Sequence, residues 1–207
     1  QLSHQSSLKN FIVTQISGVT GTTTYLNLYG GTDYTLNITG AITSPTYSPD
    51  KSPERFPLDP DKWAVSSVTS DSPTITSPTA STWYGGVLLT PAGPSISIPI
   101  GAWRVFYRVI VDVNITLAGV GGVGSRVTLS NANNTESDLE FTTAVLISLP
   151  IGTDIQRSTY TSEKNLNLSS KTTYFLNVLT GNSGATNLIM NVAGAFRTVV
   201  KAECAFL

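Results

Sequence analysis

Charge is the scarcest property of this chain, because only 12% of its 207 residues are Asp, Glu, Lys or Arg. Soluble domains usually carry about twice that share, and here Ser, Thr and Asn supply most of the polarity. The formal net charge is -1 and the twelve basic residues are scattered singly. This pattern lacks the concentrated positive charge that binds nucleic acid, so we expect no nucleic-acid partner. No apolar run approaches the ~20 residues that span a bilayer, so we expect no membrane insertion.

Histidine and cysteine occur once each, as His4 and Cys204. His4 lies in the polar stretch of residues 1–10, which we expect to be disordered. A single histidine removes most nucleophile–base catalysis and most zinc chemistry. A single cysteine excludes an intrachain disulfide and a thiolate metal site, and its place in an apolar alternation predicts a buried small hydrophobe. We therefore expect a protein that is not an enzyme and that needs no metal or cofactor.

Helical periodicity is missing as well, since no stretch of about 10–12 residues repeats its apolar positions every three to four residues. In its place, the segment Ser97–Thr116 alternates in a period of two from Trp103 onward. One face of this segment is wholly apolar or aromatic, and it comprises Trp103, Val105, Tyr107, Val109, Val111, Val113 and Ile115. The pattern predicts a strand of roughly 13 residues, about 43 Å long. Such a strand must lie on a hydrophobic core along nearly its whole length.

The opposite face of this strand carries two large apolar residues, Phe106 and Ile110, next to Arg104 and Arg108. Water alone favours polar residues at such positions, so we expect a neighbouring sheet or a neighbouring chain to cover them. We predict a homotrimer whose contact surface includes Phe106 and Ile110. The arginines then need acceptors, for which Asp112 or a carboxylate of a neighbouring chain could serve.

Further short strands follow one another with turn residues between them. They are expected at Trp83–Leu89, Ser95–Ile100, Arg126–Leu129, Phe141–Leu149, Tyr174–Val178, Ile189–Val192 and Arg197–Phe206. Many short strands separated by turn signals are typical of a sandwich or a barrel. The number of expected strands favours an all-β jelly-roll β-sandwich.

The first 62 residues differ from the rest of the chain. A strand is expected at Phe11–Ile16, and Tyr25–Gly30 is echoed by Thr35–Gly40. We interpret the echo as one β-hairpin, the alternative being a vestige of a repetitive β-structured shaft. Residues 43–62 hold five prolines and many charges, which excludes a central strand and indicates a linker or surface loop. We therefore expect a neck or stalk at residues 1–62 and a head domain at residues 63–207.

Two motifs have possible chemical interpretations. Gly119–Gly124 matches G-x-G-x-x-G, but a dinucleotide site needs a helix after the motif, and Ser125–Ser130 is strand-like. A flexible loop between two strands is the better interpretation. Alternation places Glu136, Asp138 and Glu140 on one face, where they could hold a cation or act as an acid–base pair. A solvated loop that leads into a strand explains them equally well.

The adjacent aromatics Trp83 and Tyr84 lie between a Ser/Thr-rich segment and two glycines. Neighbouring strand residues point to opposite faces, so one of the pair is expected at the surface. An exposed aromatic beside polar loops is the kind of side chain on which sugars stack. Trp83 and Tyr84 are therefore candidate receptor-binding residues, the alternative being that both pack in the core and in an interface.

Three segments carry a resemblance to a known family. Ile98–Val105, followed by the long strand, resembles the P-x-G-x-Y-x-V/F motif of C1q- and TNF-like jelly rolls. Leu166–Leu168 before Thr172–Leu176 looks like the L-x-L-x-x-G-x-x-Y-x-L hairpin of that family, with Ser169–Lys171 where a glycine is usual. The chain also runs to its end in an apolar strand, Val199–Phe206, as those domains do.

The resemblance covers residues 95–207 and implies a jelly-roll head like those at the tips of phage tail fibres and viral spikes. Such heads trimerise and bind the host surface. The expected function is therefore non-enzymatic attachment at the virion surface, with a host glycan or protein as receptor. A purely structural capsid or vertex protein and a carbohydrate-binding module of a larger enzyme are the alternatives. A carbohydrate-binding module is expected to be a monomer. Binding of the protein to host cells distinguishes an attachment protein from a purely structural one.

Overall fold

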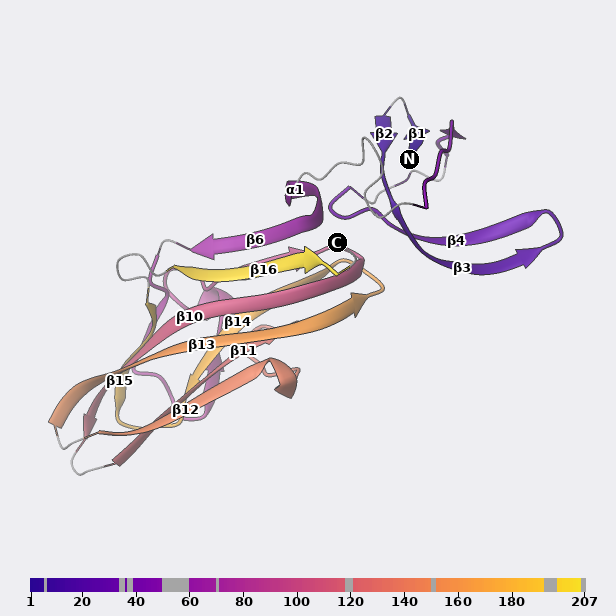
Figure 1. Cartoon of the computed structure of the whole chain (residues 1–207). Helices are drawn as coiled ribbons and strands as arrows, with labels where there is room; N and C mark the ends of the chain where they lie inside the picture. Colours follow the sequence, from indigo (N-terminus) through magenta and orange to yellow (C-terminus); the bar gives the residue numbers. More distant parts are fainter. Residues whose placement is uncertain are drawn as a thin grey trace.

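The structure is a computed structural model that describes residues 1–5, 7–33, 36, 39–49, 60–69, 71–117, 121–149, 152–191 and 197–205. Within these residues the chain is almost entirely β-strand (Figure 1). The helical elements described are single turns, namely α1 (Pro60–Trp63), η1 (Gly86–Leu88) and η2 (Leu139–Phe141). No described helix has the length and apolarity needed to cross a membrane.

The long strand expected from the sequence is β10 (Gly101–Leu117), and one sheet is built around it. One edge of β10 pairs with β13 (Gly152–Leu168) along its full length. The other edge is shared, since residues 103–108 pair with β16 (Thr198–Cys204) and residues 110–115 pair with β15 (Ala185–Asn191). Two short strands complete this first sheet, β6 (Ala64–Thr69) beside β16 and β7 (Thr74–Thr76) beside β15.

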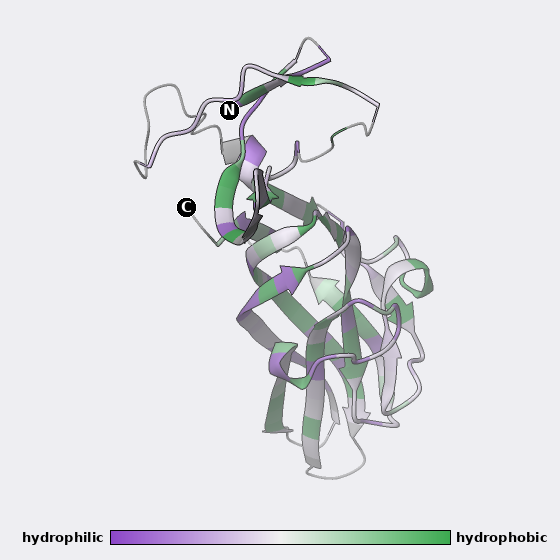
Figure 2. Ribbon diagram, turned by 90° about the vertical axis from the view of Figure 1, so that its right-hand side faces the viewer, coloured by the Kyte–Doolittle hydropathy of each residue, from purple (hydrophilic) through white to green (hydrophobic). Residues whose placement is uncertain are grey.

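The second sheet packs against the first. Its strands, in spatial order, are β12 (Thr142–Leu149), β11 (Gly121–Ser130), β14 (Thr172–Thr180), and then β8 (Thr82–Tyr84) and β9 (Ser95–Ile98) along one shared edge. All pairs are antiparallel. Alternating hydropathy along the strands is visible in Figure 2.

The core lies between the two sheets. The seven alternate residues of β10 predicted to face inward are all at most 1% exposed, and they meet Val127, Leu129, Leu176 and Val178 of the second sheet. The hydroxyl of the buried Tyr107 lies 3.0 Å from the carbonyl oxygen of Phe141, and burial raises the pKa of Tyr107 to about 12. Two antiparallel sheets joined by repeated crossings form a jelly-roll β-sandwich, which confirms the predicted fold class.

The crossings correct one expectation. The hairpin expected between Leu168 and Thr172 does not exist, because β13 belongs to the first sheet and β14 to the second. This connection is a crossover between layers, and the alternation on each side of it serves two different sheets.

The N-terminal region is ordered into two small sheets. β1 (Leu2–His4) pairs with β2 (Ser7–Lys9) and with β5 (Ile42–Thr43), so the expectation of disorder over residues 1–10 is wrong. His4, expected at a frayed end, is only 2% exposed. The other N-terminal sheet is a hairpin of β3 (Ile12–Thr20) and β4 (Thr23–Tyr29) around Gly21, which has a φ of +60°.

This hairpin was not predicted. Tyr25–Tyr29 pairs with the strand that precedes it, across a two-residue turn. Half of the second copy of the echo, at Thr35, Asn37 and Ile38, lies outside the described residues. A short loop closes at a smaller entropic cost than a longer one, which favours the local partner.

The N-terminal region meets the head at one end of the sandwich. Thr32 N donates to Lys62 O at 2.8 Å, and Gly31 has a φ of +61°. A Cβ at Gly31 would lie 2.7 Å from the ring of the buried Trp63, so this close approach requires glycine. Residues 50–59 of the predicted linker lie outside the described residues, and the division at residue 62 stays a prediction.

Several predicted strand ends move. β8 stops at Tyr84 rather than at Leu89, because Gly86 has a φ of +46° and residues Gly86–Leu88 form η1. The described glycines of the G-x-G-x-x-G motif lie inside β11 rather than in a flexible loop, and Gly119 and Val120 lie outside the described residues. Phe141 belongs to η2, while Val192 and Phe206 lie outside the described residues.

Candidate functional site

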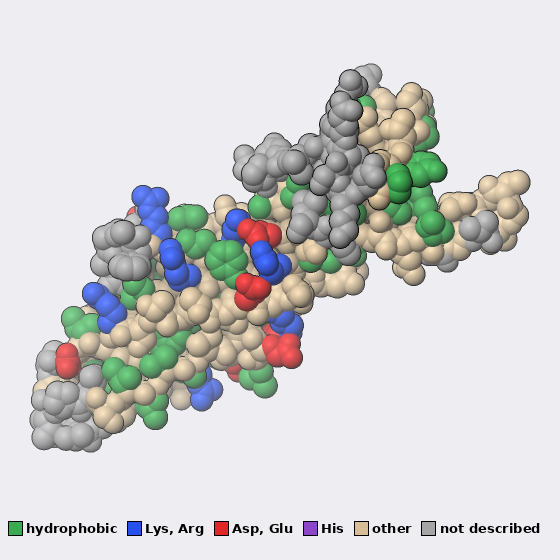
Figure 3. Space-filling view, in the orientation of Figure 1, with side chains coloured by type: hydrophobic (Ala, Val, Ile, Leu, Met, Phe, Trp, Pro, Cys, Tyr) green, Lys and Arg blue, Asp and Glu red, His purple; other side chains and the backbone are tan. Residues whose placement is uncertain are grey.

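The outer face of the first sheet carries the predicted interface residues. Phe106 pairs with Glu163 of β13 on one side and with Lys201 of β16 on the other. Phe106 and Ile110 are both half-buried in the single chain. The structure therefore places both residues on one surface, as the sequence predicted. Figure 3 shows the molecule in the orientation of Figure 1, with apolar and charged side chains interspersed.

Most of the charges beside Phe106 neutralise one another within the sheet. Arg104 Nη2 lies 2.7 Å from Glu203 Oε2, and Lys201 Nζ lies 2.5 Å from Glu203 Oε1. Glu163 adds a weaker contact to Arg104 at 3.9 Å. Hydrogen bonds from Lys201 and then from Arg104 hold the pKa of Glu203 below its ordinary value. A face whose cations are already paired can be covered at a smaller desolvation cost.

Asp112 lies on the same face, but it is not the ion-pair partner of Arg104 or Arg108, for which it was a possible acceptor. Its carboxylate, 3% exposed, accepts two hydrogen bonds from Arg157 of β13, from Nε at 2.8 Å and from Nη2 at 2.7 Å. This fork raises the pKa of Arg157. Arg108 is exposed and has no ion pair with any residue that the structure describes.

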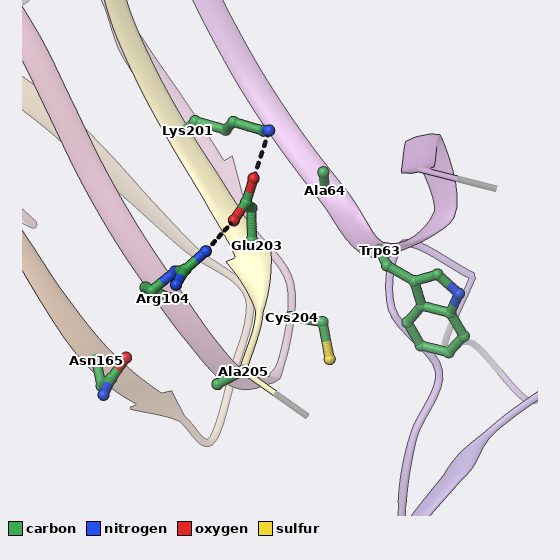
Figure 4. A pocket seen from close by; sticks show the side chains of 8 residues that line it. All are labelled: Trp63, Ala64, Arg104, Asn165, Lys201, Glu203, Cys204 and Ala205. Atoms are coloured by element: carbon green, nitrogen blue, oxygen red, sulfur yellow. Dashed lines mark hydrogen bonds and ion pairs between the residues drawn. The ribbon is translucent and has the colours of Figure 1, made fainter. Parts of the chain in front are cut away.

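A cavity of about 400 Å³ lies at the end of this face, next to the neck (Figure 4). Its lining comprises Trp63, Ala64, Arg104, Asn165, Lys201, Glu203, Cys204 and Ala205. The Lys201–Glu203–Arg104 contacts run along one side, and the indole of Trp63 stands on the other (Figure 4). The sequence did not indicate this cavity, because strands separated by tens of residues build it. Its polar donors beside an aromatic ring suit a polar ligand.

The two candidate receptor residues, Trp83 and Tyr84, point to opposite faces of the second sheet. Tyr84 is 9% exposed, and its hydroxyl accepts a hydrogen bond from Thr79 N at 2.7 Å, so it belongs to the packed interior. Trp83 is half-buried on edge strand β8 and pairs with Leu179, which itself pairs with Arg126. Trp83 therefore lies on the outer face of the second sheet, on the far side of the sandwich from Phe106.

The acidic trio is engaged in structural contacts. Asp138 accepts from Glu140 N at the start of η2, and Lys164 Nζ lies 2.6 Å from the carboxylates of both Asp138 and Glu140. The hydrogen bond from Lys164 lowers the pKa of Asp138. Thr142 Oγ1 donates to Glu136. No group of three or more His, Cys, Asp or Glu side chains is placed to hold a metal ion within the part of the chain that the structure describes.

The strand order and the core define the class of this protein as an all-β jelly-roll. No family model and no curated protein matches the sequence. Among solved structures it is similar to Eiger TNF from S. frugiperda, with a TM-score of 0.37 and 11% identity over 69% of this chain and 92% of that one.

Two structures of infectious bursal disease virus are also similar to this chain. For the Gx strain the TM-score is 0.28 and the identity 12%, over 68% of this chain and 36% of that one. For the Gt strain the corresponding values are 0.23 and 16%, over 87% and 47%. The chain thus spans less than half of these viral chains.

Proposed function

We propose that this chain is a non-enzymatic attachment protein of a phage or viral fibre or spike, which forms a homotrimer and binds a glycan or protein on the host surface. The observation that carries the proposal is the outer face of the first sheet. There Phe106 and Ile110 are half-buried in the single chain on β10, among charges that are mostly paired already. A monomer leaves this face wet, whereas a closed symmetric assembly hides it.

The remaining cation supports the same assembly. Arg108 lies between Phe106 and Ile110 on this face. In an assembly, a carboxylate of a neighbouring copy supplies the acceptor that Arg108 needs, and that contact fixes the register of the interface.

The outer face of the second sheet is the surface left for a receptor. Trp83 lies there, in line with Leu179 and Arg126. An indole and a guanidinium on one face, with Leu179 between them, combine a stacking surface with hydrogen-bond donors, which suits a saccharide or a polar protein loop. Because this surface is opposite the Phe106 face, trimerisation leaves it accessible.

The self-association is tested by light scattering of the wild type, of Phe106→Lys and of the control Leu146→Lys, whose site is 75% exposed on the second sheet. We expect the wild type and the control to have three times the chain mass of 22.0 kDa. Phe106→Lys should shift the mass towards the monomer, because a lysine ammonium cannot be covered at that position. A monomeric wild type at micromolar concentration would refute the assembly.

Receptor binding is tested separately on the trimer. Trp83→Ala should lose binding to host cells or to a glycan array, whereas Leu139→Ala, at another exposed apolar site, should retain it. A trimer with no binding to any host surface would indicate the alternative, a purely structural capsid or vertex protein.

A further inference from the structure

Exposed apolar side chains are concentrated in the N-terminal region. Of the 13 large hydrophobic residues that are exposed in the described parts of the chain, seven lie within the first 49 positions: Leu8, Val13, Ile16, Tyr25, Leu26, Ile42 and Tyr47. Four of these seven belong to the hairpin of β3 and β4, which projects away from the head in Figure 1. A two-stranded ribbon is marginally stable alone, so exposed apolar residues on it need a partner.

The hairpin register places three of these four residues, Val13, Ile16 and Leu26, on one face, whereas Tyr25 pairs with Gly18 on the other. Directly paired residues share a face, and the pairs Val13–Leu28 and Ile16–Leu26 alternate with the pair Gln15–Asn27. Asn27 Nδ2 donates to Gln15 Oε1 at 2.9 Å on the polar face. Val13, Ile16 and Leu26 are 48%, 63% and 48% exposed.

A bulge in β3 creates this arrangement. Register shifts occur between Val13 and Gln15 and between Ile16 and Gly18, and the first of them lies between Val13 and Ile16. It lets apolar residues spaced by three in β3 face apolar residues spaced by two in β4. Without this bulge, Val13 and Ile16 would point to opposite sides of the ribbon.

The apolar face is turned away from the chain's own head at the root of the hairpin. There the first pair, Ile12 and Tyr29, belongs to the opposite face. Ile12 packs on the head core, and Tyr29 Oη lies 3.1 Å from Asn167 Oδ1. The next pair along the ribbon, Val13–Leu28, therefore points to the other side. The head of the same chain does not cover it.

We propose that the apolar face of the β3–β4 hairpin packs against the hairpins of the other copies of this chain, with the same face of each hairpin turned towards the common axis. This inference rests on the self-association in the proposed function. The hairpin carries no charged residue, so identical copies meet without repulsion. Its two outer strand edges pair with no other described strand, so each hairpin also offers its neighbour a backbone edge.

The position of the hairpin connects this contact with the Phe106 face. Asn167, which contacts the hairpin root, projects from the same face of the first sheet as Asn165, Glu163 and Phe106. A copy that covers the Phe106 face as far as Asn167 therefore also reaches the root of this hairpin. The hairpins add a second contact zone to an assembly that the heads already hold.

Site-specific cross-linking tests the inference on the full chain. Leu26→Cys places a thiol on the apolar face, and Asn27→Cys places one on the polar face of the same strand; the native Cys204 is buried. A bismaleimide with a short spacer should link chains bearing Leu26→Cys and should not link chains bearing Asn27→Cys. In parallel, Ile16→Lys with Leu26→Lys should raise the concentration of half-dissociation about tenfold or more, whereas Gln15→Lys with Asn27→Lys should change it little.

The outcomes separate this inference from the proposed function. If the wild type has the trimer mass and Phe106→Lys dissociates it, but neither cysteine is cross-linked and both lysine pairs behave alike, the self-association stands and the hairpin contact is wrong. A different protein, or a further segment of a longer chain, that covers the hairpin would give that same result. A wild type that is monomeric at all concentrations overturns both.

Discussion

At the scale of single residues, β10 divides its side chains between a closed interior and an open face. Val109 is 1% exposed at the middle of the core face, and Arg108 beside it is exposed on the other side. Two consecutive residues of the strand therefore lie in opposite environments, one in the hydrophobic core and one in solvent.

Val109→Asp should abolish folding, since an unpaired buried carboxylate costs at least ~3 kcal/mol. Arg108→Ser should fold normally, because the guanidinium has an exposed position and water can replace it. Circular dichroism and thermal unfolding of the two variants check this. Equal damage from both substitutions would show that the assignment of the faces is wrong.

Glu203 links stability to pH. Its pKa is lowered from 4.5 in the folded chain, chiefly by the hydrogen bond from Lys201 and then by that from Arg104. The ionised carboxylate thus contributes stability that is present above pH 4.5 and is lost as the pH falls through the lower folded pKa. Glu203→Gln should melt earlier than the wild type at pH 7, and the difference should shrink on acidification. A difference that is the same at pH 7 and pH 3 would contradict this linkage.

At the scale of elements, the pairing of β10 with β13 decides which charges meet. Asp112 and Arg157 are opposite each other in the register, so the carboxylate is closed in and the guanidinium lies over it. The exposure of the pair is uneven, because the side chain of Asp112 is 4% exposed and that of Arg157 is 55% exposed.

This unevenness predicts that the two halves of the pair are not equivalent. Arg157→Met should destabilise the fold more than Asp112→Asn, because it leaves a buried carboxylate without its guanidinium partner. The guanidinium freed by Asp112→Asn can instead be solvated. Urea unfolding of both variants measures the difference, and an equal or reversed order would count against this interpretation.

At the scale of the whole molecule, the described core belongs almost entirely to the head. Its buried cluster runs from Trp63 to Cys204, and from the N-terminal region only Ile12 packs against it as a partly buried residue. The N-terminal sheets are joined to the head mainly around Tyr29, Gly31 and Trp63.

We therefore expect residues 60–207 to fold cooperatively by themselves. The fluorescence of Trp63 should shift to longer wavelength in this fragment, because Gly31 no longer lies against its ring. The chain without this truncation, and the fragment carrying Val109→Asp, are the controls. A fragment without a cooperative transition would mean that the neck is part of the folding unit.

The alternation of the long strand and the use of its faces could be predicted from the sequence. Successive side chains of an extended backbone point to opposite sides, which is a local steric property, so period-2 patterning marks a strand and its buried face wherever it occurs. Residue chemistry likewise indicated a buried Cys204 and predicted Phe106 and Ile110 on one outer face.

The partners of each strand were decided only by the tertiary structure. Pairing is a competition among all strands, set by loop closure and by burial over the whole core. That competition paired β4 with β3, divided β13 and β14 between two sheets, and gave Asp112 to Arg157. The cavity beside Trp63 and the apolar face of the hairpin could not be predicted from the sequence for the same reason. Each is formed by residues that only pairing and packing bring together.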